Sequence, residues 1–341
     1  MTAVHARQAA GPTLLDGSAV LSFRAMASPI TLTLLRPGPD GDACLERAAE
    51  VIRDVERTCS RFDAESALSL ANAEPSRWHD VPATLVWAVE EAHRAYRETG
   101  GLFDPRVLDV LLSWGYDRSL PFGSGEVDRT ASSVPMAPLP DSPDGAFPWW
   151  PEVAHGDIGW RLNLAGQPID LGGIGKGLAV RWAAAELANA GQGYSVDAGG
   201  DCAFGGVGPD GVGPDGDGWH VGVEDPADPD QLLLVLDLID TGCATSSTRL
   251  RRWRVGGTPV HHLVDPRTRR PGGDGLVAVT VVASDPAWSE VWSKTLFLAG
   301  AAEIRSRAER LELAAAWVEE DGTVGTTAQL DPMVIWRRGD V

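Results

Sequence analysis

The spacing of apolar residues predicts strands at the start of the chain and helices after them. Residues 21–35 are rich in apolar side chains, which alternate with polar ones in the second half as they do in a strand. Asp42 precedes, as an N-cap would, a set of apolar residues at helical spacing: Leu45, Ala48, Ile52, Val55 and Cys59. A second helix is predicted over residues 83–99, and Gly100 and Gly101 would end it, because glycine adopts the left-handed conformation of a helix C-terminus.

The rest of the chain mixes strands and helices without a regular βαβ repeat. Residues 118–157 are rich in Pro, Ser, Gly and Asp, which predicts a long surface insertion. The elements expected after it are strands at 161–171, 193–197, 219–223, 232–239, 260–264 and 277–282, helices at 178–190, 287–298 and 301–311, and a closing hairpin of 314–318 with 333–337. This order predicts an α+β fold in a single domain, residues 19–338, after a flexible tail of residues 1–18.

The composition limits the partners of this chain. Its 341 residues, 43% of them hydrophobic, are enough to bury a core. An excess of acidic over basic residues, 48 against 29, gives a formal net charge of −19. Such a charge repels nucleic-acid backbones and anionic lipid, so neither is expected as a partner. An anionic ligand would need a local cationic or metal site in order to bind.

Cysteine usage and hydropathy predict a cytoplasmic protein. The four cysteines form no Cys-x-x-Cys pair and no cluster with histidine, which argues against a zinc site or a disulfide framework and suits a reducing compartment. The first twenty residues lack the apolar run of a secretory signal, and no apolar stretch of about twenty residues is available to span a bilayer.

A glycine run after Asp170 is the first candidate site. It would let the backbone approach a ligand, and the N-terminus of the following helix would offer N–H groups to a phosphate. Lys176 adds a cation within the run. The run has neither the GK[ST] ending of a P-loop nor the G-x-G-x-x-G fingerprint of dinucleotide-binding folds, and a glycine-rich turn without a ligand is an equal alternative. The glycines are Gly172, Gly173, Gly175 and Gly177.

A second candidate lies at residues 258–268, where His261 and His262 precede Asp265 and Arg267. This order concentrates a titratable base, a carboxylate and a guanidinium. On a strand the two histidines would face opposite sides, so at most one can reach a given site. The alternative is a buried histidine on a strand, followed by a routine Asp-Pro turn.

Residues 101–105 are a third candidate. Phe103 and Asp104 follow a predicted helix end and would offer an aromatic surface and a hydrogen-bond acceptor to a ring system. Taken alone, such a segment is more often a turn with its packing residue.

Together with four further segments, these three resemble the ApbE-like FAD:protein FMN transferases in order and spacing, from about Phe23 to Gly300. The matching segments are FDAESALSLAN at 62–72, GLFDP at 101–105, IDLGGIGKG at 169–177, DAGGD at 197–201, WHVGVEDP at 219–226, ATS at 244–246 and HLVDPRT at 262–268. Seven short matches in one order are hard to obtain by chance, so the chain is identified as a member of this family.

The resemblance implies a T-fold-like α+β architecture, with mixed sheets and flanking helices around a flavin cleft. It implies transfer of the FMN phosphoryl group from FAD to a threonine of an acceptor protein that carries a flavinylation motif, with release of AMP. The residues it implies at the FAD site are Met26, Phe62, Leu102, Phe103, Asp104, Asp170, Lys176, Thr245 and His262. The catalytic residues it implies are His262 and Asp265, acting by positioning and by charge neutralisation at the pyrophosphate. We add Lys294 to them as a hypothesis, because it occupies a position where this sequence departs from the family pattern.

A divalent ion, Mg²⁺, is also implied, and here the sequence departs from the family pattern. That pattern combines a backbone carbonyl of the glycine run with an aspartate and a threonine four residues later; the matching positions are Gly173, Glu290 and Lys294. A protonated lysine has no lone pair and repels a metal ion. Either Glu290 and Lys294 form an exposed i,i+4 ion pair, or the Lys294 ammonium takes the place of the metal charge and Glu290 holds it.

Three functions follow from the resemblance. The first is FMN transfer, the second is flavin binding by a protein that lost turnover with its metal, and the third is hydrolysis of FAD to FMN and AMP. Lys294 favours the second, because a divalent ion supplies charge stabilisation at phosphorus. The retained polar residues favour the first and the third: Asp104, Asp170, Lys176, His262 and Asp265.

Overall fold

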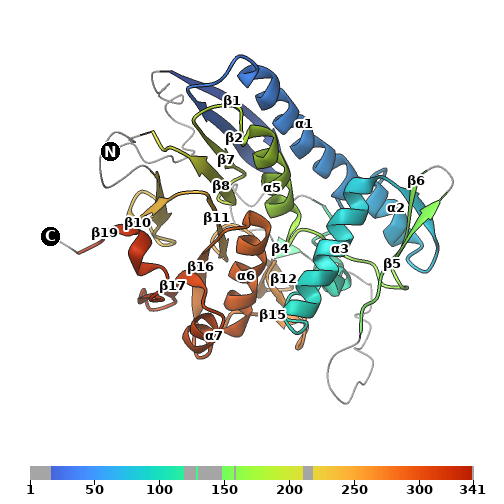
Figure 1. Ribbon diagram of the computed structural model, residues 1–341. Coiled ribbons are helices and arrows are strands. Elements are labelled where there is room, and N and C mark those ends of the chain that lie inside the picture. Colours follow the sequence, from blue (N-terminus) through green and yellow to red (C-terminus); the bar gives the residue numbers. More distant parts are fainter. Residues whose placement is uncertain (1–16, 119–127, 130–147, 157–158, 210–217, 340–341) are drawn as a thin grey trace.

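The computed structural model describes residues 17–118, 128–129, 148–156, 159–209 and 218–339, and its central element is an eight-stranded sheet (Figure 1). The strand order is β1-β2-β7-β8-β11-β16-β17-β18, and every neighbouring pair is antiparallel. The bounds are Ser18–Ala25 (β1), Ser28–Leu35 (β2), Gly193–Asp197 (β7), Cys202–Gly206 (β8), Thr241–Ser247 (β11), Leu276–Ala283 (β16), Ala314–Glu319 (β17) and Val324–Thr326 (β18). The predicted 21–35 stretch is thus a hairpin, which reverses at Met26 and Ala27 with φ of 53° and 58°.

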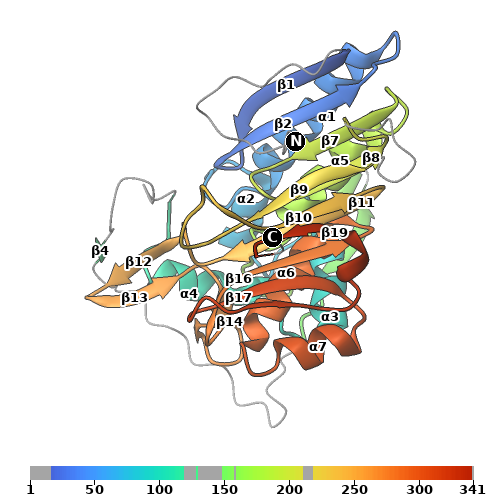
Figure 2. The ribbon, with the colours of Figure 1, turned by 90° about the vertical axis from the view of Figure 1, so that its left-hand side faces the viewer.

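Helices cover one face of this sheet, and a small sheet covers the other (Figure 2). The helices are Gly41–Cys59 (α1), Gly175–Leu187 (α5) and Pro286–Ala299 (α6), and the small sheet, in the order β19-β10-β9, consists of Val334–Arg337 (β19), Leu232–Leu238 (β10) and Trp219–Glu224 (β9). On the helix side, Leu32 and Leu34 of β2 pack under α1 and α5. On the other side, Leu236 of β10 packs against Phe204 of β8. Burial on both faces explains the long apolar runs of the central strands.

A second layer lies beside α6 and carries its own small sheet. It contains Ala67–Ala73 (α2), Ala83–Glu98 (α3) and the strands His79–Val81 (β3), Gly159–Asn163 (β6) and Glu152–Gly156 (β5), in the order β3-β6-β5. Trp149 is 1% exposed in the core of this layer. The predicted surface insertion of residues 118–157 therefore ends earlier than expected, since 148–156 belong to the core and β5; residues 119–127 and 130–147 lie outside the described chain.

Short elements complete the fold. They are Pro105–Val107 (η1), Leu108–Ser113 (α4), Asp128–Arg129 (β4), Arg252–Val255 (β12), Thr258–His261 (β13), Val264–Asp265 (β14), Arg270–Pro271 (β15), Ile304–Arg310 (α7) and Asp331–Met333 (η3). Strands β12 and β13 form a hairpin, and β14 pairs with β15. The α+β class predicted from the sequence is confirmed.

The predicted closing hairpin is wrong. Strand β17 pairs with β16 and β18 in the central sheet, whereas β19 crosses to the other layer and pairs with β10. Both segments alternate as strands, but alternation does not identify the partner of a strand.

Several predicted boundaries also differ. The strand expected over 161–171 ends at Asn163, because its side chain accepts the N–H of Ala165 at 2.8 Å and Ala165 turns the chain with φ of 57°. Helix α5 begins at Gly175, within the glycine run. The strand expected at 260–264 is interrupted at His262. Asp42 does not cap α1, which starts one residue before it.

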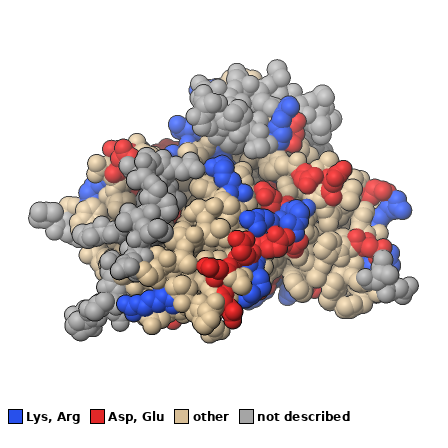
Figure 3. Space-filling view, turned by 90° about the horizontal axis from the view of Figure 1, so that it is seen from above, with Lys and Arg blue, Asp and Glu red and all other residues tan. Residues whose placement is uncertain are grey.

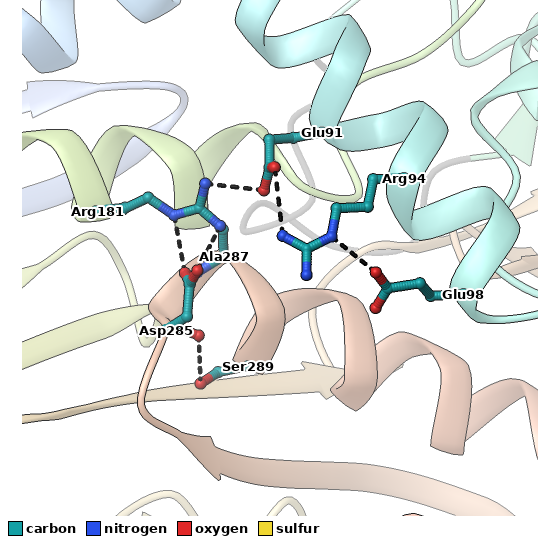
Figure 4. Close-up of polar contacts among 7 residues, drawn as sticks. All are labelled: Glu91, Arg94, Glu98, Arg181, Asp285, Ala287 and Ser289. Atoms are coloured by element: carbon teal, nitrogen blue, oxygen red, sulfur yellow. Dashed lines mark hydrogen bonds and ion pairs between the residues drawn. The ribbon is translucent and has the colours of Figure 1, made fainter.

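An ion-pair network ties three helices together (Figure 4). Arg181 of α5 donates to Glu91 of α3 at 2.8 Å and to both carboxylate oxygens of Asp285 at 2.8 and 2.6 Å. Asp285 is also the N-cap of α6, accepting from the N–H of Ala287 at 3.0 Å. The start of α6 is thereby fixed against α5, the helix that carries the glycine run.

Surface charge is mixed on the face seen in Figure 3, where acidic and basic side chains lie next to one another instead of forming a patch of one sign. Helix α1 has the same character: Arg47 pairs with Glu186 at 2.9 Å and Arg57 with Glu50 at 2.8 Å. Exposed pairs of this kind contribute little to stability.

Candidate functional site

A cavity forms where loops from distant parts of the sequence meet α6. Its wall comes from the chain after α1, the segment that leads through η1 and α4, the glycine run before α5, the residue before β12, the chain from the end of β13 into β14, and α6 itself. Eight of the residues predicted for the site line it: Phe62, Leu102, Phe103, Asp104, Asp170, Gly173, His262 and Lys294. Five predicted residues are not in its lining: Met26, Lys176, Thr245, Asp265 and Glu290.

One side of the cavity is aromatic. Phe62 and Tyr116 lie with ring centroids 5.4 Å apart, and the Arg61 guanidinium lies 4.0 Å from the Phe62 centroid and 4.5 Å from that of Tyr116. Such a surface suits a flat ring system, because aromatic faces stack on rings and attract cations. Phe103 adds a third ring to the wall.

Arg61 is a site residue that the sequence analysis missed. Its side chain is 4% exposed, donates to Asp170 through Nε at 3.1 Å and to the Tyr116 carbonyl through Nη1 at 2.6 Å. Its Nη2 is buried without a partner. A guanidinium with an unpaired donor in a cavity wall is a ready site for an acceptor group of a ligand. Nothing in the sequence around an arginine that follows a helix shows that one of its donors will face a ligand site.

The two predicted carboxylates of the wall already have partners in the chain. Asp170 accepts from Arg61 and from the N–H of Gly172 at 2.8 Å. Asp104 accepts from Arg106 through two N–H groups at 2.9 and 2.7 Å. Both residues thus fix the loops that bear them, and both line the cavity.

Close packing explains the glycines of the run. A Cβ on Gly173 would lie 2.9 Å from Phe103 Cε2 and 3.5 Å from Lys294 Cδ. A Cβ on Gly177 would lie 2.6 Å from the Cα of Ala287 and 2.8 Å from the Pro286 carbonyl, which leaves no room for any side chain. The run therefore lets α5 approach α6 as well as the cavity.

Glu290 lies at the contact of these two helices and is fully buried, at 0% exposure. One oxygen accepts from the Gly177 N–H at 2.7 Å and the other from the Lys294 ammonium at 2.9 Å. Burial alone would raise the pKa of Glu290, but Lys294, Lys176 and the Gly177 N–H outweigh it and hold the pKa below its usual range. The hypothesis of an exposed Glu290–Lys294 pair is therefore wrong.

Lys176 lies behind the cavity wall, in an ion pair with the buried Asp201. Burial lowers the pKa of Lys176 to about 8, although the negative charge of Glu290 acts to raise it. The positive charges of Arg251 and Lys294 lower this pKa further. Cationic groups are thus concentrated here, in a chain whose net charge is −19. Arg251 lines the cavity and belongs to this group of cations.

The two histidines separate as predicted. His261 accepts the N–H of Leu263 at 3.3 Å, and its ring packs edge-on against Phe297. His262 lines the cavity, with Nδ1 at 3.4 Å from the Arg251 carbonyl oxygen. Because a carbonyl only accepts, Nδ1 carries the hydrogen and Nε2 keeps its lone pair. Burial lowers the pKa of His262 well below its usual value, with Arg251, Lys294 and His261 adding to the effect, so the ring is neutral at pH 7.

The remaining predicted residues support the surroundings of the cavity. Asp265 is buried and accepts from Arg267 at 3.0 and 2.8 Å, which fixes the turn after His262. Thr245, an exposed residue of β11, shares a hydrogen bond of 2.8 Å with Thr280. The methyl group of Met26 lies beside the first residue of α5.

The described residues were also searched for clusters of metal-ligating side chains and for helices that could span a membrane. No three His, Cys, Asp or Glu side chains among them lie close enough together to hold a metal ion. The helices that the structure describes are all too short or too polar to span a bilayer. The cytoplasmic location stays a prediction.

Comparison with known proteins gives consistent matches. A sequence model of the ApbE family matches residues 26–317. The FAD:protein FMN transferase of Escherichia coli K12 is 27% identical over 164 residues, 48% of this chain and 45% of that protein, so the chain spans about half the length of this curated relative. One from Klebsiella pneumoniae is 25% identical over 270 residues, 78% of this chain and 74% of its own. The crystal structure of the ApbE protein of Thermotoga maritima has a TM-score of 0.72 at 22% identity, covering 93% of this chain and 99% of that one.

Proposed function

This chain belongs to the ApbE family, and we propose that it is an FAD:protein FMN transferase, which joins FMN from FAD to a threonine hydroxyl of an acceptor protein and releases AMP. The relatives named for this activity supply the reaction, and the arrangement of the cavity supports it. The match covers only 45% of the E. coli relative, so the proposal depends on the site itself.

One observation carries the proposal: a single cavity combines an aromatic wall with a group of cations. Phe62 and Tyr116 form the aromatic side, while Lys294 and Arg251 line the cavity with positive charge. FAD needs both, because it joins a flat flavin to an anionic pyrophosphate. Of the residues that line the cavity, we assign Phe62, Leu102, Phe103 and Asp104 to the flavin half, and Asp170, His262, Arg251 and Lys294 to the adenosine and pyrophosphate half. Met26, Lys176 and Thr245 lie outside the lining, so we assign them no direct contact with FAD.

In the proposed reaction the threonine oxygen attacks the phosphorus of the FMN half. The new O–P bond forms as the P–O bond to the AMP phosphate breaks, and AMP leaves with the bridging oxygen. The hydroxyl proton passes to Nε2 of His262, whose lone pair is available because Nδ1 faces a carbonyl. Lys294 lines the cavity, and its ammonium neutralises negative charge on the pyrophosphate. Asp265 acts as a positioning residue that fixes the turn after His262.

Mg²⁺ is implied by the family pattern, with the Gly173 carbonyl and Glu290 as its ligands, and the residues present do not fit it. Both Glu290 oxygens already accept hydrogen bonds, from Gly177 and from Lys294. The third ligand position holds an ammonium group, which donates and cannot coordinate. No step of the reaction is therefore assigned to a metal ion.

The function is tested by incubating the purified protein with FAD and an acceptor protein that carries a threonine flavinylation motif. We expect covalent flavin fluorescence on the denatured acceptor band and an equal amount of released AMP. An acceptor with alanine in place of the threonine should stay unlabelled. His262→Gln should lose most of the transfer, whereas His155→Gln, an exposed residue of β5, should keep it.

Each other outcome identifies a different activity. AMP release without labelled acceptor, unchanged with several acceptors, would contradict the transferase and indicate hydrolysis of FAD. Bound FAD with neither product would indicate a flavin-binding protein, which Lys294 at the metal position favours.

A further inference from the structure

Lysine is nearly absent from this chain, and both lysines lie at the site. Arginine supplies the other basic side chains, and the two lysines are Lys176 and Lys294. Lys176 pairs with Asp201 behind the cavity wall, whereas Lys294 reaches the wall itself. A compact ammonium is the side chain that comes closest to a metal ion in size and charge density.

The Lys294 side chain lies against both other predicted metal positions, Gly173 and Glu290. Its stem packs against Gly173, since a Cβ there would lie 3.5 Å from Lys294 Cδ. Its Nζ donates to Glu290 Oε1 at 2.9 Å, and the side chain is 16% exposed. The lysine stem thus lies beside Gly173, and its ammonium is a cation that the chain itself supplies to Glu290.

Glu290 is turned toward this cation, and each of its two oxygens already accepts a hydrogen bond. Its second oxygen accepts the Gly177 N–H at 2.7 Å, and its side chain is 0% exposed. A metal ion bound through a remaining lone pair of Glu290 would lie beside the Lys294 ammonium. The two like charges would repel each other, which disfavours a divalent ion at this position.

The ammonium still has donors for a ligand. The lysine ammonium carries three N–H groups, and in the described structure Nζ donates one hydrogen bond, to Glu290. The others are available to phosphate oxygens on the cavity side. Arg251 lines the same cavity and adds a second positive charge.

We propose that the Lys294 ammonium, held by Glu290, is the resident cation of the pyrophosphate site, so that FAD binding needs no divalent metal ion. The inference rests on the proposed function for the identity of the ligand. It concerns binding, and transfer adds a second readout in which the same cation neutralises charge on the departing AMP phosphate.

The first test measures FAD affinity by flavin fluorescence, after dialysis against EDTA and again with added Mg²⁺. We expect the two dissociation constants to agree within about twofold, a change too small to reflect a lost ion contact. An affinity that falls about tenfold or more in EDTA and returns with Mg²⁺ would overturn the proposal.

Variants at the pair separate an ammonium site from a metal site. Lys294→Met should weaken FAD binding by about tenfold to a hundredfold, with no rescue by Mg²⁺. The double variant Glu290→Asp with Lys294→Thr shortens the carboxylate and supplies hydroxyl oxygen, so its FAD affinity should become dependent on Mg²⁺. Arg77→Met, an exposed cation paired with Glu74, is the control and should bind FAD normally. Rescue of Lys294→Met by Mg²⁺ would contradict the proposal.

The scarcity of lysine allows a direct observation that does not depend on activity. Protein labelled with ¹³C in the lysine Cε position should give two side-chain signals, and Lys294→Met identifies one of them. We expect that signal to shift when FAD is added in EDTA and not when Mg²⁺ alone is added. A Lys294 signal unmoved by saturating FAD would overturn the proposal. Absence of transfer to any acceptor would contradict the proposed function and leave the binding result as it stands.

Discussion

The backbone N–H of Gly177 donates to Oε2 of Glu290 at 2.7 Å, and this bond joins the first turn of α5 to a fully buried carboxylate on α6. The contact is possible only because residue 177 has no side chain: the helices touch at Pro286 and Ala287. The glycine run thus organises the site by packing, since it fixes the carboxylate that in turn orients Lys294.

Replacing Gly177 by alanine should separate the two helices. The added Cβ would lie 2.6 Å from the Ala287 Cα, and neither backbone can yield without moving a helix. We expect the free energy of unfolding to fall by about 1–3 kcal/mol, the usual range for overpacking. Gly175→Ala is the matched control, because its Cβ would meet only the flexible Met26 methyl at 3.8 Å. Urea unfolding measures both, and equal losses would contradict this account.

Removing the charge of Glu290 should destabilise the protein more than removing the whole pair. Glu290→Gln keeps an acceptor for the Gly177 N–H but leaves the Lys294 ammonium without its counter-charge. A loss of about 3 kcal/mol is expected from the cost of breaking one half of a buried pair. The double variant with Lys294→Met should recover part of this loss. A double-mutant cycle of unfolding free energies tests the coupling, and additive losses would show that the pair does not interact.

Sequence periodicity predicted local features and failed where partners come from elsewhere in the chain. At most one of His261 and His262 was expected to reach a given site, and only His262 lines the cavity, although the strand already ends at His261. The i,i+4 spacing of Glu290 and Lys294 placed the two side chains together correctly. Their burial could not be predicted, because it results from α5 packing against α6, and no local signal near residue 290 reports that contact.

The pairing of strands that lie far apart in the sequence could not be predicted either. Strands β17 and β19 both show strand-like alternation, yet they join different sheets because each completes a layer whose other strands lie far away in sequence. The cavity residue Arg61 was hidden for the same reason. Its side chain contacts Asp170 and Tyr116, which come from other segments.

Acidification should destabilise the protein partly through His261. Burial lowers its pKa to about 4, below the value of about 6.5 in an unfolded chain. The unfolded state therefore binds more protons between these two values, so stability is complete above about pH 6.5 and falls as the pH drops toward 4. His261→Asn keeps an acceptor for the Leu263 N–H and should flatten this decline in urea unfolding. The exposed control His155→Asn should leave the slope unchanged; equal slopes in all three proteins would contradict the assignment.

Arg61 should contribute to FAD binding through its unpaired donor. Its Nη2 is buried in the cavity wall without a partner, while Nε and Nη1 are held by Asp170 and Tyr116. Lysine keeps the charge but not the fork of donors, so Arg61→Lys should weaken FAD binding by about tenfold. Arg57→Lys, an exposed change in the last turn of α1, is the control. FAD titration and thermal unfolding without FAD are measured together: a lower melting temperature with unchanged affinity would show that Arg61 acts only on the fold.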